Sequence, residues 1–361
     1  MKYIDLITAL SNAKGAPGFE EEVVEVLQQF RGSYSMQVDS MHNTYFNLQS
    51  IDSSKPTVML DAHLDEVALM VKGIDAHGLI MLQTLGGWMN EHIAGQTYFI
   101  RNRWGEYIRG ICASKPIHFL TPAERERKIE LQDLKIDVGV RSREEAIEVY
   151  GIEVGQPIVP ATQAEVKSET GFVLGKAFDD RIGVALSVAI MNELADELDQ
   201  LPYNLVAAFS TQEEVGLRGA QVTAQRVKPQ MAFVFEGCPS DDFTSSDALE
   251  QGKLGFGPQI RHRDVSYISN SRIIQWLQSA AEAKNISLQH AVREGGGTNA
   301  GSIHLAQQGI PCGVISVPAR YVHSHASYIC YQDFEDALQL MLATLRRLTQ
   351  EDIDQFELRS Y

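Results

Sequence analysis

The 361-residue chain has few cysteines, and its four thiols, Cys112, Cys238, Cys312 and Cys330, are far apart in the sequence. No Cys-x-x-Cys pair occurs, so the sequence indicates neither a disulfide framework nor a zinc ribbon, and free thiols in a reducing compartment are expected. No run approaches the roughly 18 apolar residues that a membrane-spanning helix needs. The N-terminal segment 1–23 becomes acidic early and lacks the features of a signal peptide. We therefore expect a cytoplasmic protein without a membrane partner.

Positive charge is also scarce, because 31 lysines and arginines face 47 aspartates and glutamates, which gives a formal net charge of -16. Proteins that bind nucleic acids need basic patches that contact phosphates, so we expect no nucleic-acid partner. The composition, 44% hydrophobic and 22% charged, is ordinary for a soluble globular enzyme. A chain of this length favours two domains.

The pattern of apolar residues changes twice along the chain. Between about residues 70 and 160, short strand-like runs alternate with glycine turns, and one helix is expected at 142–149. After about residue 165, buried strands such as 204–210 alternate with long helices. This alternation predicts an α/β fold: a doubly wound mixed sheet with helices on both faces, interrupted by a β-rich insert. The expected domains are residues 1–68 plus 165–361, and an inserted domain at 69–164.

Carboxylates and imidazoles follow the strands of the predicted sheet and precede one long helix. Open α/β sheets bind ligands at the carboxyl ends of their strands, so we expect these side chains to gather at one edge. Such a mixture suits divalent transition metals, and it is large enough to hold two ions that share a bridging carboxylate. The side chains come from five segments: Asp61 to Glu66, Asp179-Asp180, Glu213-Glu214, Glu236, and His323 with His325.

Six motifs, in this order, resemble those of the dinuclear-metal aminopeptidases that include glutamyl aminopeptidase and the tetrahedral (TET) aminopeptidases. Some members of that family carry older labels as deblocking aminopeptidases or cellulases. The likeness covers nearly the whole chain and implies a zinc-exopeptidase-like fold, with the insert serving as a dimerisation domain. The motifs are AHLDEV (62–67), AFDDRIG (177–183), TQEEVGLRGA (211–220), FEG (235–237), GGGTNAGSIH (295–304) and PARYVHS (318–324).

The resemblance implies a role for each of six side chains. His63 and Glu236 would bind one metal ion, His323 and Glu214 would bind the other, and Asp179 would bridge the two. Glu213 would be left as the general base. The ions would be Zn²⁺ or Co²⁺, with Mn²⁺ as a third candidate, and the substrates would be peptides with a free N-terminus. The family forms dimers and dodecamers, and the sequence does not choose between them.

Three further residues carry expectations of their own. Asp65 follows His63 by two positions, so it is a good candidate to orient that imidazole, and the alternative is a turn aspartate. Asn299 stands where the resembled family usually has aspartate, which puts supporting details of the site in doubt. The resemblance also makes His92 a candidate to reach the site of a neighbouring subunit.

Two other functions compete with the peptidase hypothesis. Paired carboxylates could serve glycoside hydrolysis, but that chemistry does not require His63 or His323, and the chain has three tryptophans for sugar stacking. A non-catalytic peptide-binding scaffold would tend to lose the base or a metal ligand. Here Glu213 and all five candidate ligands are present.

Overall fold

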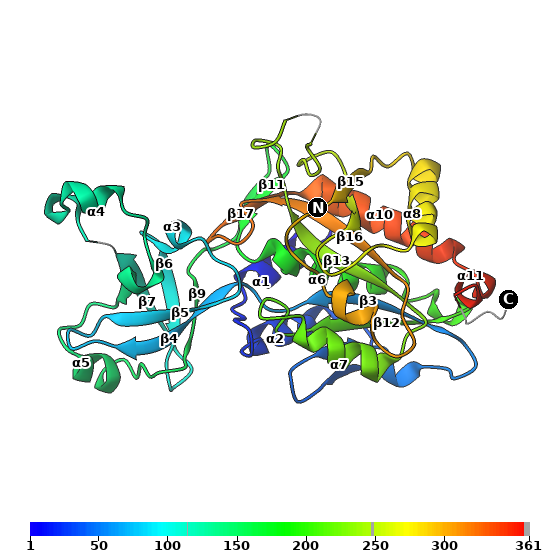
Figure 1. The fold of residues 1–361 in the computed structure, drawn as a ribbon. Helices are drawn as coiled ribbons and strands as arrows, with labels where there is room; N and C mark the ends of the chain where they lie inside the picture. Colours follow the sequence, from blue (N-terminus) through cyan, green and yellow to red (C-terminus); the bar gives the residue numbers. More distant parts are fainter. Residues whose placement is uncertain (114, 247–248, 357–361) are drawn as a thin grey trace.

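The two parts of the chain that differ in sequence pattern form two lobes in the computed structural model (Figure 1). The structure describes residues 1–113, 115–246 and 249–356. The larger lobe contains a mixed sheet with helices on both faces, and the smaller lobe is a barrel. Among these residues, no helix is both long and apolar enough to cross a lipid bilayer.

The sheet of the larger lobe has parallel strands at its centre and antiparallel strands at its margins. Eleven strands lie within the described residues, and β12, β3, β13 and β16 form the parallel centre. The order across the sheet is β1 (Met36–Val38), β2 (Thr44–Phe46), β12 (Asn204–Ser210), β3 (Thr57–His63), β13 (Met231–Pro239), β16 (Cys312–Arg320), β17 (Ser327–Cys330), β11 (Phe172–Gly175) and β10 (Glu165–Lys167), while β14 (Gln259–Arg263) pairs with β16 and with β15 (Gln289–Val292).

Both faces of the central strands are buried, which explains why these strands are almost continuously apolar in sequence. In β3, Val58, Leu60 and Ala62 point into one apolar core, while Met59 points into the other. Helices α1 (Ile4–Asn12), α2 (Glu21–Phe30), α6 (Phe178–Glu193), α8 (Ser271–Lys284) and α10 (Tyr331–Arg347) cover the first face, and α7 (Arg218–Val227) and α9 (Ala300–Ile303) cover the second. The helix α6 is apolar on nearly all sides because it is buried between the sheet and its neighbouring helices. The short α11 (Gln350–Asp354) ends the described chain, and two single-turn 3₁₀ helices, η1 (Leu48–Ser50) and η4 (Leu198–Gln200), complete this lobe.

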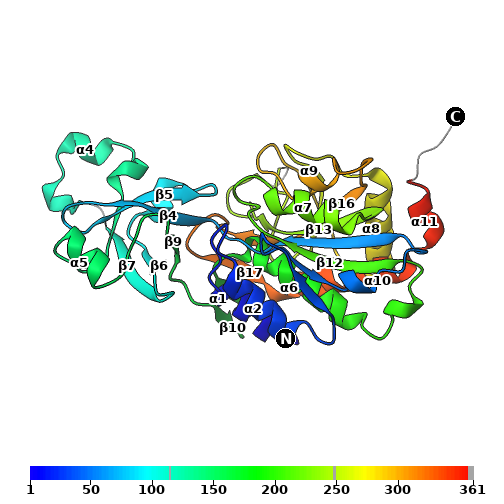
Figure 2. The same ribbon diagram turned by 90° about the horizontal axis from the view of Figure 1, so that it is seen from below.

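The smaller lobe is a closed six-stranded barrel, as counted in the described residues, and lies to one side of the sheet (Figure 2). The short strands predicted between residues 70 and 160 form this barrel, and the core packs inside it. Its strands are β4 (Ala68–Ile74), β5 (Ile80–Leu85), β6 (Thr97–Arg101), β7 (Tyr107–Ala113), β8 (Lys135–Asp137) and β9 (Pro157–Pro160), and its helices are α3 (Asn90–Ile93), η2 (Ile117–Phe119), α4 (Pro122–Glu126), η3 (Leu131–Asp133) and α5 (Arg143–Glu148).

The predicted fold class is confirmed, since a mixed α/β sheet with helices on both faces is interrupted by a separate β-rich unit. The helix expected at 142–149 is present as α5, and the Ser142 side chain accepts a hydrogen bond from the Glu145 amide at its start. The prediction of one helix in this region was wrong, because α3 and α4 are present as well, and both are too short to show a helical period in the sequence. The division into an insert at 69–164 and a second domain around it stays a prediction about independent units.

Candidate active site

One aspartate lies between two imidazoles at the carboxyl end of the parallel strands. The Oδ1 of Asp179 is 3.1 Å from Nε2 of His63, and its Oδ2 is 3.4 Å from Nε2 of His323. Each imidazole directs its other nitrogen toward a backbone carbonyl. Nδ1 of His63 lies 3.0 Å from the carbonyl oxygen of Asp65, and Nδ1 of His323 lies 2.9 Å from the carbonyl oxygen of Gly87. The two Nε2 atoms therefore face a common centre, and the two oxygens of Asp179 face one each.

The expected carboxylates divide between these two imidazoles. His63, Asp179 and Glu236 form one group whose potential ligand atoms all lie within 4.8 Å of one another, and Asp179, Glu214 and His323 form another. A third group, His63 with Glu213 and Glu214, overlaps both. A buried oxygen in each group, Oε1 of Glu236 and Oε1 of Glu214, has no hydrogen-bond partner within the described part of the chain. Since buried carboxylate oxygens are normally paired, these atoms fit a cation that each would bind.

The charges of the site depart strongly from those of exposed side chains. Burial raises the pKa of Glu214 and of Glu236 well above its usual value, and nearby carboxylates add to the rise. Burial alone would lower the pKa of His323, but hydrogen bonding to Asp179 and the charge of Glu214 raise it to about 10. Burial opposes ionisation of Asp179 as well, yet His323 and His63 hold its pKa below the usual range. The centre thus holds several buried carboxyl groups whose ionisation is opposed by burial and by one another, and divalent cations would favour their ionised forms.

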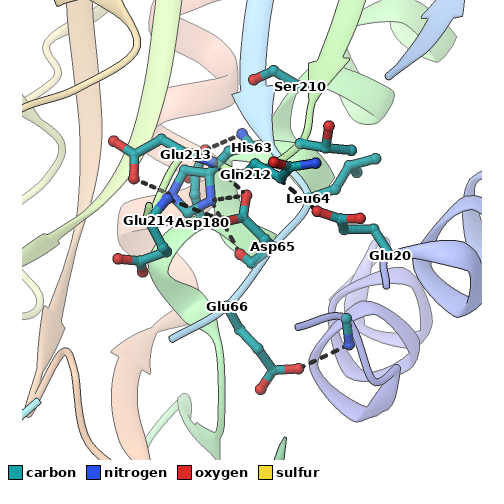
Figure 3. Close-up of polar contacts among 12 residues, drawn as sticks. Glu20, His63, Leu64, Asp65, Glu66, Asp180, Ser210, Gln212, Glu213 and Glu214 are labelled. Carbon is teal, nitrogen blue, oxygen red and sulfur yellow. Dashed lines mark hydrogen bonds and ion pairs between the residues drawn. The ribbon is translucent and has the colours of Figure 1, made fainter. Parts of the chain in front are cut away.

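Glu213 lies beside the first group and forms a long ion-pair contact with His63. Its Oε2 is 3.9 Å from Nε2 of His63, and its side chain is largely buried (Figure 3). Burial raises the pKa of Glu213 to about 7, with the charges of Asp179 and Asp65 adding to the rise. A carboxylate with a pKa near neutrality has the proton affinity that a general base needs.

Asp65 has a second task that the sequence did not reveal. Its Oδ1 is 3.4 Å from Nδ1 of His63, but the hydrogen-bond partner of that nitrogen is the Asp65 backbone carbonyl, so the orienting role of the side chain stays a prediction. The same carboxylate also accepts hydrogen bonds from the backbone N–H groups of Glu213, at 2.9 Å, and Glu214, at 3.1 Å. Because the predicted partner was only the imidazole, the link from Asp65 to the segment of the two glutamates was missed.

Close backbone approaches bring the site segments together. A Cβ atom on Gly237 would lie 2.2 Å from the carbonyl oxygen of Phe178, so glycine lets β13 pass directly beside the segment that contains Asp179. Asp180 caps the regular part of α6 through the amide of Gly183, and its Oδ2 accepts a hydrogen bond from the His63 amide at 3.0 Å. These contacts explain why two adjacent aspartates have different surroundings.

The barrel also reaches the site. Gly86 and Gly87 follow β5, and Gly87 supplies the carbonyl that His323 contacts. A Cβ atom on Gly86 would lie 3.2 Å from Oε2 of Glu214, where the backbone has a φ of 87°. The sequence prediction assigned the insert to assembly and did not identify this contact, because nothing local to a Gly-Gly turn shows what it touches.

Asn299 lies behind the site. Its Nδ2 donates hydrogen bonds to Oδ1 of Asp61 at 2.7 Å and to Oγ of Ser210 at 2.6 Å. An aspartate at position 299 would place a second buried carboxylate against Asp61, and one of the two would have to carry a proton. The asparagine amide therefore suits Asp61 directly, and none of the three groups that could hold a metal ion includes Asn299.

The remaining predicted histidine, His92, lies in α3 of the barrel. The electrostatic influence of His92 lowers the pKa of His325, after the larger effect of burial, so the two imidazoles are neighbours within one chain. The expectation that His92 reaches another subunit stays a prediction.

A cavity beside the site is bordered by residues of both lobes, with Val67 and Pro160 on one side and Tyr321 and His323 on the other.

A half-buried aspartate between two imidazoles, with further carboxylates grouped around each, at the carboxyl edge of a doubly wound sheet, is typical of a metal-dependent hydrolase. The family follows from the sequence, since residues 43–340 match the model of the M42 glutamyl aminopeptidases. The chain belongs to this family. It is therefore an aminopeptidase, a hydrolase that acts on peptides from the N-terminus.

Related proteins match this chain over almost its full length. The glutamyl aminopeptidase of Lactococcus lactis subsp. cremoris is 30% identical over 364 residues, which cover 100% of each chain. The crystal structure of a TET aminopeptidase from a marine sediment Thaumarchaeota archaeon has a TM-score of 0.92 and 35% identity, covering 99% of this chain and 100% of the other. The TET1 peptidase of Pyrococcus horikoshii, which can assemble into a tetrahedron or a large octahedral shell, has a TM-score of 0.84 and 27% identity, with 96% and 100% of the two chains covered.

Proposed function

We propose that this aminopeptidase binds two divalent cations per subunit and uses Glu213 as its general base. The observation that supports this most strongly is the position of Asp179, whose two oxygens face different imidazoles. His63 and Glu236 would hold one ion, and His323 and Glu214 the other. Zn²⁺ and Co²⁺ suit this mixture of nitrogen and oxygen ligands, and Mn²⁺ is a third candidate.

Two bound cations would lower the pKa of a water molecule between them and polarise the scissile carbonyl. Glu213 would accept the proton of the attacking water and then deliver it to the leaving amine. Burial of Glu213 supports this role, because it raises the proton affinity of the carboxylate. Asp65 would keep the base in place by holding its backbone N–H.

The substrates would be peptides with a free N-terminus, whose positive amine is attracted to this acidic centre. The nearby cavity is bordered by Asp179 and Glu214, and by Glu66, whose carboxylate is already paired with Lys176 and Arg181. An acidic lining of this kind favours a cationic amine over an N-acylated end.

A panel of chromogenic aminoacyl substrates, assayed with Zn²⁺, Co²⁺ and Mn²⁺ in turn, tests this proposal. Turnover should require a free amine, should disappear after exhaustive chelation, and should return when one of the three metals is added. Activity that survives complete metal removal would exclude the mechanism. Hydrolysis of aryl glycosides in place of aminoacyl substrates would favour the glycosidase alternative, and inactivity toward both would favour the scaffold.

We further propose that the protein is cytoplasmic and that it self-associates through the barrel, as a dimer or as a larger assembly up to a dodecamer. Ile117 and Phe119 support this, since both lie in η2 and expose 60% and 69% of their surface. Replacing both by aspartate should reduce the native mass measured by light scattering. Leu305, a residue of the sheet lobe that is 75% exposed, is the matched control, and Leu305→Asp should leave the mass unchanged.

A further inference from the structure

The segment that contains the two adjacent glutamates is held by an unusual series of side-chain contacts. Four consecutive backbone N–H groups, those of residues 211–214, each donate a hydrogen bond to a side-chain oxygen from another part of the chain. Asp65 accepts the last two bonds, as described above. The first donates to Oδ1 of Asn43 at 2.9 Å, and the second, from Gln212, donates to Oε1 of Glu20 at 3.2 Å.

Glu20 is fully buried although it belongs to none of the groups that could hold a metal ion. Its Oε1 accepts a second hydrogen bond from the amide of Gly18 at 2.8 Å, whereas its Oε2 is buried and has no partner among the described residues. Figure 3 shows the carboxylate lying between the N-terminal helices and the Gln212 backbone. One oxygen atom therefore joins the turn at residues 15–20 to the segment that contains the candidate base.

Gln212 is the residue of this segment whose backbone needs support. Its φ is 56°, in the left-handed region that side chains other than glycine adopt at a cost. The unusual conformation turns the chain between the end of β12 and Glu213. A hydrogen bond to the Gln212 amide stabilises this turn directly, one residue before the candidate base.

The same N-terminal turn also contacts the segment of the first imidazole. The amide of Gly15 donates to Oε1 of Glu66 at 3.1 Å, and the amide of Glu66 donates to the carbonyl of Gly15 at 3.0 Å. The Gly15–Glu20 turn thus contacts both strand ends that supply His63 and Glu213. It can set their separation although it contributes no side chain to the centre itself.

We propose that Glu20 is a positioning residue, which places the carboxylate of Glu213 by holding the Gln212 backbone amide in its left-handed turn. This inference rests on the proposed role of Glu213 as base. A displacement of about 1 Å at a reacting group can cost about 100-fold in rate, so a loss of this hydrogen bond is large enough to measure. Metal binding is not expected to change, because the ligands are held by other contacts.

The charge of Glu20 is not needed for this role. Burial raises the pKa of Glu20 to about 8, and the nearby charge of Asp65 contributes, so the buried carboxyl is mostly protonated at neutral pH. A glutamine would keep one carbonyl oxygen to accept both backbone hydrogen bonds, and its NH₂ group would occupy the place of Oε2. Glu20→Gln is therefore the conservative variant, and Glu20→Leu, which has a similar volume and no acceptor, is the disruptive one.

Asp333 provides a matched control for the loss of a buried carboxyl. It is also fully buried, and it accepts hydrogen bonds from the amides of Gly255, at 2.8 Å, and Gly257, at 2.7 Å. None of these residues belongs to a group that could hold a metal ion. Asp333→Leu should therefore lower the melting temperature without changing turnover per folded, metal-loaded enzyme.

The experiment measures kcat, KM, metal content and melting temperature for the full-length wild type and these variants. Glu20→Leu should lower kcat about tenfold to hundredfold, leave KM within about twofold and keep the wild-type metal content. Glu20→Gln should retain kcat within about threefold of the wild type on the same grounds. If Glu20→Leu does not fold, Glu20→Asp replaces it, because it withdraws the acceptor by one methylene group and should also lower kcat.

The inference would be overturned by a wild-type kcat in Glu20→Leu, or in Glu20→Asp where that variant replaces it. A loss of metal in parallel with activity would overturn it, and so would a Glu20→Gln enzyme as impaired as Glu20→Leu. An equal loss of kcat in Asp333→Leu would also overturn it, since general destabilisation would then account for the effect. A wild-type enzyme that turns over no aminoacyl substrate would instead refute the proposed function, so the two failures can be told apart.

Discussion

Exchanging the two adjacent glutamates separately is the most direct test of how the site divides its tasks. Glu213→Gln and Glu214→Gln remove the same charge from neighbouring positions and leave the side-chain size nearly unchanged. The backbone hydrogen bonds to Asp65 involve main-chain N–H groups, so neither substitution removes them. Any difference between the two variants must therefore come from the side chains.

The expected magnitudes follow from the neighbours of each side chain. Glu213 has its nearest cationic neighbour at 3.9 Å and is the better placed of the two to act on substrate, so Glu213→Gln should remove general-base catalysis. That contribution is about 100-fold to 10,000-fold in kcat, or roughly 3–5 kcal/mol of transition-state stabilisation. Glu214 belongs to the group around His323, where Oε2 lies 3.5 Å from Nε2. Glu214→Gln should therefore weaken the binding of one cation by about tenfold or more.

Metal content by mass spectrometry, combined with kcat on the best chromogenic substrate, distinguishes the two effects. Glu213→Gln should retain two cations per subunit and lose turnover, while Glu214→Gln should retain fewer and regain part of its turnover when metal is added in excess. Wild-type kcat in Glu213→Gln would refute its role as base. Two variants that both unfold would mean that the pair is structural.

Two more predictions concern residues that support the fold and the site. Asp65→Asn should lower kcat and keep the metal content. The two carboxylate oxygens accept one backbone N–H each, whereas an amide has a single oxygen, and such charge-assisted hydrogen bonds contribute about 1.5–3 kcal/mol each. An unchanged kcat would contradict this role. Burial raises the pKa of Asp333 to about 7, so the folded protein retains a proton that the unfolded chain releases above about pH 4. The free energy of unfolding of the wild type, relative to Asp333→Asn, should therefore fall as the pH rises from 4 to 7 and stay level above 7. Urea denaturation at pH 4, 5.5, 7 and 8 measures the difference, and a difference independent of pH would contradict the burial argument.

The gathering of the candidate ligands at one edge could be predicted from the sequence, because all of them except Asp179, which lies at the start of α6, follow or end apolar strands; their individual roles were implied by the family resemblance. Parallel strands end at one edge of the sheet, so His63 at the end of β3 and Glu236 within the last residues of β13 were expected to meet there. The supporting contacts could not be predicted in this way. Glu20 and Gly87 lie in turns, and the sequence of a turn does not show which distant amide or imidazole it will touch.

The sequence alone determined the order of elements, the two-part organisation, and the acidic edge at which carboxylates and imidazoles gather, since hydrophobic periodicity and strand direction depend on local pattern. The family resemblance implied how those side chains divide into groups, and the tertiary structure added the geometry, with one oxygen of Asp179 facing each imidazole. It also showed that Asp65 and Glu20 hold the backbone beside the base, and that the barrel supplies a carbonyl to His323. These relations depend on the packing of segments up to 236 residues apart, and a separation of that kind leaves no local signal in the chain.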